Sequence, residues 1–86
     1  MNIYIGNLSN ETTEEDLQQA FEAFGRVESV KIIKDRYSGE WGFGFVEMPV
    51  RAEAKFAITG LNGTLLKGAM LQVSEARPDS ERLRGG

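Results

Sequence analysis

The feature that most constrains the fold is the segment 41–48, in which aromatic residues alternate with glycines. Successive side chains of a β-strand point to opposite faces, so one face carries the aromatic residues and Glu47. The other face carries the glycines, followed by Val46 and Met48. A face that ends in a charged residue suits solvent, and this favours an exposed position for Trp41, Phe43 and Phe45. Bulky side chains of a strand ordinarily point inward, and this alternative remains open here.

The segment 3–8 alternates more clearly than the segment 41–48. Ile3 and Ile5 are expected to face the core, and Tyr4 to face away from it. If the two segments are neighbouring strands, three exposed rings gather in the middle of a sheet. We call this group, Tyr4, Phe43 and Phe45, the aromatic platform. Exposed apolar surface of this kind usually marks a binding site.

The two segments resemble the signatures of the RNA-recognition motif (RRM) family, a hexamer and an octamer. The octamer of the family reads Lys/Arg-Gly-Phe/Tyr-Gly/Ala-Phe-Val-x-Phe/Tyr. This chain matches it at 42–46 and at the free position 47. It departs from the family at Trp41, where a cation is usual, and at Met48, where an aromatic residue is usual. The hexamer, residues 3–8, matches throughout.

Two amphipathic helices and two further strands are predicted from the spacing of apolar residues. The first helix is expected to begin at the capping residue Thr13 and to end at Gly25, and the second to follow Pro49. The further strands are predicted at about 27–34 and 70–76. The buried faces of the helices are expected to consist of Leu17, Ala20, Phe21 and Phe24 in the first and Val50, Ala54, Ala57, Ile58 and Leu61 in the second.

The predicted order is strand, helix, strand, strand, helix, strand. Short connections and right-handed crossovers then give an α+β, ferredoxin-like βαββαβ fold, a four-stranded antiparallel sheet with two helices on one face. The first and third strands are central neighbours in this topology, which places Tyr4 beside the octamer. The RRM resemblance covers residues 2 to about 77, so we expect an RRM domain at 1–77 and a flexible C-terminal tail at 78–86.

Composition excludes several kinds of protein. A chain of 86 residues has room for one domain. Without cysteine or histidine it has no disulfide framework and no thiolate or imidazole ligands, and we expect no metal, no cofactor and no enzymatic activity. No apolar run approaches the roughly 20 residues of a membrane span, and residues 1–25 contain no basic residue. We therefore expect no membrane span and no targeting peptide, and a cytoplasmic location, with nucleus and organelles left open.

The formal net charge of −3 is unusual for a nucleic-acid-binding domain, whose surface is usually basic. Much of the negative charge gathers in one early segment that has no basic residue, at Glu11, Glu14, Glu15, Asp16 and Glu22. If this segment is a helix behind the sheet, the platform side is close to neutral. We then expect weaker and less salt-dependent binding than a basic domain shows.

The RRM resemblance implies binding of single-stranded RNA by a monomer. It implies that Tyr4 and Phe45 stack on bases and that Phe43 lies between riboses. Trp41 either stacks on a further base or covers the edge of the strand. Secondary candidates for polar contacts are Lys31, Gln72 and Arg77, and Arg36 in the loop 35–40 is the candidate for a phosphate contact. For each of them the alternative is an ordinary solvent-exposed side chain. Single-stranded DNA remains a candidate, because stacking does not require the 2′-hydroxyl.

The main alternative is a protein-interaction module built on the same fold. An acidic domain that carries Trp41 suits this function, and so does Phe56, which falls off the apolar stripe of the second helix. Phe56 itself is expected to pack against a neighbouring side chain. Acyl-phosphate hydrolysis, known among small ferredoxin-like domains, is not favoured, because nothing places Arg26 or another arginine in a phosphate-binding loop.

Overall fold

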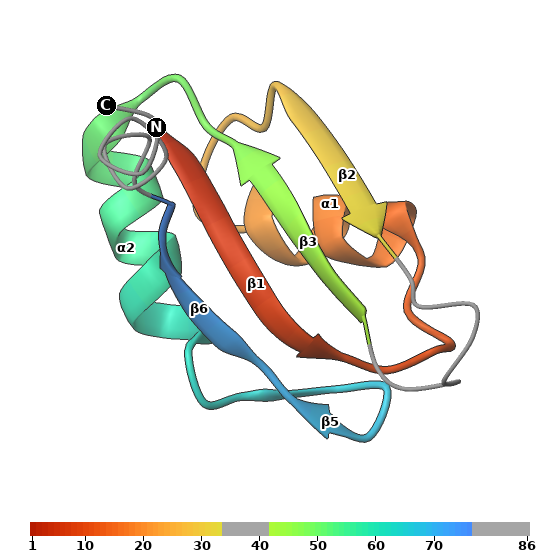
Figure 1. Ribbon diagram of the computed structural model, residues 1–86. Helices are drawn as coiled ribbons and strands as arrows, with labels where there is room; N and C mark the ends of the chain where they lie inside the picture. The colour runs from red at the N-terminus through yellow and green to blue at the C-terminus, as the bar shows by residue number, and fades with distance from the viewer. Residues whose placement is uncertain (34–41, 77–86) are drawn as a thin grey trace, which may run out of the picture.

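A computed structural model of the chain describes residues 1–33 and 42–76. The elements in these ranges are β1 (Asn2–Leu8), α1 (Glu14–Glu22), β2 (Ser29–Ile33), β3 (Gly42–Glu47), α2 (Arg51–Leu61), β4 (Leu65–Leu66), β5 (Ala69–Met70) and β6 (Gln72–Glu75). An antiparallel sheet has the strand order β2-β3-β1-β6, and β4 pairs with β5 in a separate hairpin. Both helices cover the same face of the four-stranded sheet (Figure 1). The predicted ferredoxin-like α+β fold is confirmed, with β1 and β3 as the central strands.

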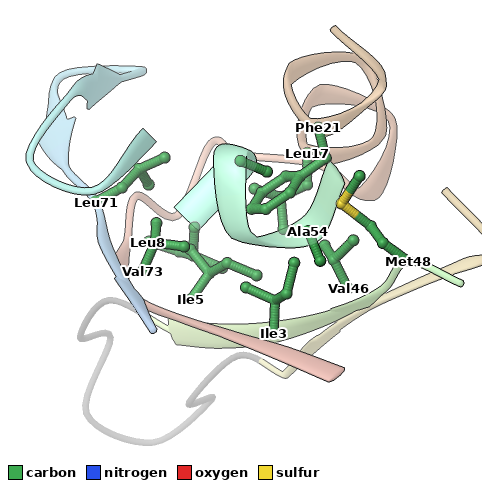
Figure 2. Close-up of a cluster of buried hydrophobic side chains, with 11 residues drawn as sticks. Ile3, Ile5, Leu8, Leu17, Phe21, Val46, Met48, Ala54, Leu71 and Val73 are labelled. Atoms are coloured by element: carbon green, nitrogen blue, oxygen red, sulfur yellow. The ribbon is translucent and has the colours of Figure 1, made fainter. Parts of the chain in front are cut away.

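One apolar core fills the space between the sheet and the helices (Figure 2). The strand residues that were expected to point inward do so, because each strand buries alternate side chains. Full burial of one such aliphatic side chain stabilises the fold by about 1.5–3 kcal/mol. The buried residues of this core are Ile3, Ile5, Leu8, Leu17, Phe21, Val46, Met48, Ala54, Ala57, Leu71 and Val73.

Helix α1 begins as the sequence predicts, with a capping box at Thr13. The Asp16 backbone N–H donates to Thr13 Oγ1 at 3.1 Å, and the Thr13 N–H donates to Asp16 Oδ2 at 3.0 Å. The predicted end at Gly25 is wrong, because the helix stops at Glu22. Gly25 instead lies against the Glu53 side chain of α2, where a Cβ atom would collide with it. This glycine therefore allows close packing and does not end the helix.

Helix α2 begins at Arg51, later than the position of Pro49 indicates. Val50 is the N-cap residue with extended backbone, and it is exposed, so its assignment to the buried stripe is wrong. Phe56 is also exposed, at 68% of its surface, and is not among the side chains that pack against the core. The remaining positions of the predicted stripe are buried or pack against the core.

The strand predicted at 70–76 is divided in the structure. The interruption is at Leu71, which lies between β5 and β6. Its N–H donates to the Thr64 carbonyl oxygen, and its carbonyl oxygen accepts from the Gly63 N–H, both at 2.8 Å. The residues before it form the β4–β5 hairpin, which the sequence analysis missed. Its turn is made by Lys67 and Gly68, which have φ values of 54° and 84°. Two successive residues with positive φ are typical of tight hairpin turns.

Candidate nucleic-acid interface

Strand β3 presents its aromatic residues on the face of the sheet that the helices leave open. Gly42, Gly44 and Val46 are buried, while Phe43 is 37% exposed and Phe45 half-buried. The glycine at position 44 is required on the covered face, because a Cβ atom there would lie 2.6 Å from the Lys31 carbonyl oxygen. Close packing against β2 thus leaves no room for a side chain at position 44 on the covered face. The expected direction of Phe43 and Phe45 is confirmed.

The three rings of the aromatic platform lie together. Tyr4 is directly opposite Phe45 in the β1–β3 ladder. The ring centroids are 6.0 Å apart for Tyr4–Phe43, 5.9 Å for Tyr4–Phe45 and 6.0 Å for Phe43–Phe45. These separations are within the range of favourable aromatic pairs. The rings therefore form one continuous aromatic surface on the open face of the sheet.

Gly6 determines how Tyr4 lies on the sheet, and the sequence analysis did not identify this role. A Cβ atom on Gly6 would lie 2.8 Å from Tyr4 Oη and 3.0 Å from Tyr4 Cε2. The tyrosine ring thus extends along β1 over the glycine. The sequence signal was present, since Gly6 is two positions after Tyr4 and belongs to the same face of the strand.

Polar and apolar side chains surround the platform in rows that cross the sheet. Lys31 on β2 is opposite Phe45, and Ser74 on β6 is opposite Tyr4. In the next row, Gln72 is opposite Gly6. Lys31 and Gln72 are exposed, so the structure brings both predicted polar residues to the same face as the rings. Ile33, opposite Phe43 and also exposed, extends the apolar surface towards the edge of the sheet.

Two of the predicted site residues, Trp41 and Arg77, lie outside the described residues. The same holds for Arg36 and for the tail at 78–86.

Helix α1, which carries most of the acidic residues of the segment 11–22, lies behind the sheet (Figure 1). Three of them, Glu14, Glu15 and Asp16, occupy the first turn of the helix, where negative charge interacts favourably with the helix dipole. The hydrogen bond from the Thr13 backbone N–H lowers the pKa of Asp16, and Lys67, with Nζ 3.9 Å from Asp16 Oδ2, acts in the same direction. The net negative charge of the chain is therefore compatible with a nearly neutral open face.

In the part of the chain that the structure describes, no group of three or more histidine, cysteine, aspartate or glutamate side chains is arranged to hold a metal ion. None of the helices in these ranges is long and apolar enough to span a membrane.

The sequence and the fold are similar to those of known proteins. The family model for the RNA recognition motif matches residues 3–72. RbpF of Nostoc sp., provisionally named an RNA-binding protein, is 45% identical over 83 residues, which cover 95% of this chain and 79% of RbpF. The crystal structure of RNA Binding Protein PG1 has a TM-score of 0.79 at 44% identity, covering 91% of this chain and 98% of PG1. An Sxl-lethal protein/RNA complex has a TM-score of 0.79 at 31% identity, and the match covers 90% of this chain and 47% of the Sxl-lethal chain. The chain therefore belongs to the RNA-recognition motif family.

Proposed function

We propose that this domain binds single-stranded RNA by stacking bases on the aromatic platform. The observation that carries the proposal is the open arrangement of Tyr4, Phe43 and Phe45, whose centroids lie within 6.0 Å of one another. Unpaired bases stack readily on aromatic side chains, whereas bases inside a duplex are not available to them. Family membership and the names of the relatives support the same function.

In this proposal each platform residue has its own role. Tyr4 and Phe45 stack on two successive bases, and Phe43 packs against the riboses between them. Lys31, opposite Phe45 in the ladder, contacts a phosphate, and Gln72 contacts a base or sugar on the β6 side. Each stack contributes about 1–3 kcal/mol, while micromolar affinity corresponds to about 8 kcal/mol. The rings therefore supply only part of the binding energy of a micromolar complex.

Residues at the margins of the platform complete the proposed site. Trp41 precedes β3 in the sequence and either stacks on a further base or covers the strand edge. Arg77 follows the last strand and supplies a second cation. We propose that residues 1–77 form the binding domain and that it is a monomeric, non-enzymatic module. A cytoplasmic location is in keeping with the absence of cysteine, which suits a reducing compartment.

The test is a titration of fluorescently labelled single-stranded RNA, single-stranded DNA and duplex RNA of equal length, at stated salt. The wild type is compared with a Phe43→Ala/Phe45→Ala double variant, and Phe56→Ala is the matched control on the helical face. We expect binding to single strands, lost in the double variant and kept in the control. The difference in affinity between single-stranded RNA and single-stranded DNA shows whether binding depends on the 2′-hydroxyl. Equal affinity of the wild type and the double variant for RNA would contradict the proposal.

A second candidate function, protein interaction, rests on Phe56. This ring is 68% exposed on α2, on the side of the sheet away from the platform. A large exposed aromatic side chain is a common feature of protein interfaces. A partner bound there would leave the platform accessible, so loss of a partner in Phe56→Ala with unchanged RNA affinity would support this second function.

A further inference from the structure

A polar row crosses the open face next to the stacking rings. Glu47 on β3 is opposite Asn2 on β1 and opposite Ser29 on β2. Alternation along β3 puts Glu47 on the same face as Phe43 and Phe45, because Val46 between them is buried. Glu47, Asn2 and Ser29 are all exposed. We call these three residues the polar row; it borders the row that contains Phe45 and Tyr4.

The Glu47 carboxylate has no protein partner in the described ranges 1–33 and 42–76. The ion pair found there joins Lys67 to Asp16, and the hydrogen bonds of Glu47 involve its backbone, whose carbonyl accepts from Glu28 N at 2.7 Å. Lys31 is opposite Phe45, one row away, and forms no ion pair with Glu47. A charged acceptor is thus available to a ligand at the edge of the platform.

A free carboxylate on a surface that binds RNA is unfavourable unless the ligand satisfies it, because the phosphates carry the same charge. The groups of RNA that can satisfy it are base N–H donors and ribose hydroxyls. Residues i and i+2 of a strand are roughly 6.6 Å apart, so a base that covers the Phe45 ring extends its edge towards Glu47. The edge of that base, and not its stacking face, decides whether the carboxylate gains a partner.

Guanine is the base whose Watson–Crick edge fits the polar row. It presents two adjacent donors, N1–H and N2–H, which suit the two oxygens of one carboxylate. Its O6 acceptor lies next to these donors and suits the amide N–H of Asn2, the residue opposite Glu47. Adenine, cytosine and uracil each place an acceptor beside their donor, and this acceptor would face the carboxylate. Repulsion of the wrong base therefore adds to attraction of the right one.

We infer that Glu47, with Asn2 beside it, selects guanine as the base that stacks on Phe45. The inference rests on the proposed function, since it specifies which base the platform accepts. A carboxylate–guanine pair with two hydrogen bonds is expected to favour guanine by about tenfold or more over the other bases.

The test uses oligouridine octamers in which one central position is uracil, guanine, inosine, adenine or cytosine. Inosine is guanine without the N2 amino group, so it keeps one of the two donors. For the wild type we expect the tightest binding with guanine, intermediate binding with inosine and weaker binding with the rest. Glu47→Ala should remove the preference and Glu47→Gln should reduce it, while Glu75→Gln, which alternation puts on the other face of β6, should leave it unchanged.

The outcomes separate this inference from the proposed function. If the octamers bind the wild type but Glu47→Ala keeps the full guanine preference, or the wild type has no preference, the role of Glu47 is wrong and the platform stands. If no octamer binds the wild type, the proposed function fails together with the inference. Thermal unfolding of each variant confirms that the fold is retained, as expected for exposed positions.

Discussion

Tyr4 and Phe45 face each other across the pairing of β1 and β3, with ring centroids 5.9 Å apart and ring planes at 63°. The two rings come from the hexamer and the octamer, which are far apart in the sequence, and the backbone ladder brings them together. Their positions therefore depend on strand register, because a shift of one residue would turn the side chains to the opposite face. The platform forms only when the whole sheet has folded in this register.

The first prediction concerns these two rings. Tyr4→Ala and Phe45→Ala should each weaken RNA binding by about ten- to a hundredfold, because each removes one stack of about 1–3 kcal/mol. Fluorescence anisotropy with labelled RNA measures the effect. Phe56→Ala, on the helical side of the sheet, is the control and should bind as the wild type does. Unchanged affinity in both platform variants would show that bases do not stack there.

The second prediction concerns the glycine under Tyr4. Gly6→Ala should weaken RNA binding nearly as much as Tyr4→Ala, because the new Cβ atom would lie 2.8 Å from Tyr4 Oη and displace the ring. The fold should tolerate the change, since the tyrosine ring can move into solvent. Ser74→Ala, opposite Tyr4 on β6, is a control that adds no atom on this face. If Gly6→Ala binds RNA as tightly as the wild type does, RNA binding does not require the Tyr4 ring to lie in its place over Gly6.

The third prediction concerns salt. Lys31 is a cation in the central rows of the open face, whereas Lys55 belongs to α2 behind the sheet. Lys31→Ala should lower the slope of log affinity against log salt concentration by about 0.7, the value for one phosphate contact on a single strand. Lys55→Ala should leave the slope unchanged. Equal slopes for the wild type and Lys31→Ala would remove Lys31 from the phosphate contacts.

The fourth prediction concerns acid stability. The hydrogen bond from the Thr13 N–H lowers the pKa of Asp16 in the folded protein, so the ionised carboxylate stabilises the fold above the ordinary pKa of aspartate. This stabilisation is lost as pH falls through the lowered pKa. Asp16→Asn should therefore unfold at a lower temperature than the wild type at pH 7, and the difference should shrink towards about pH 2.

Glu15→Gln is the matched control for Asp16→Asn, because Glu15 is in the same turn and takes no part in the capping box. Its effect on the unfolding temperature should be smaller at pH 7. A difference between the wild type and Asp16→Asn that is the same at pH 2 and pH 7 would show that the charge of Asp16 does not support the helix.

Much of the fold could be predicted because each strand of the sheet has one buried face. Alternation in 3–8 and 41–48 identified Ile3, Ile5 and Val46 as inward, and helical spacing identified Leu17 and Phe21. For the rings, alternation in 41–48 only favoured the outward direction, and the segment 3–8 with the RRM resemblance strengthened that prediction. These features depend on periodic burial, which a single sequence records directly.

The features that were missed depend on contacts between distant segments or on very short elements. Strands β4 and β5 have two residues each, too few to show a period. In the turn between them Lys67 has a positive φ, which a lysine in the sequence does not indicate. The close approach of Glu53 on α2 to Gly25, in the segment after α1, has no local signal in the sequence. The same is true of the register that places Asn2 opposite Glu47.

The most direct test of the central claim is an NMR titration of the isotope-labelled domain with an unlabelled single-stranded RNA. Stacking on the platform predicts the largest shifts at the ring protons of Tyr4, Phe43 and Phe45 and at the backbone amides of β1 and β3, with protein–RNA contacts from these rings to base protons. Shifts confined to α1 and α2, with the three rings unaffected at saturation, would contradict the account.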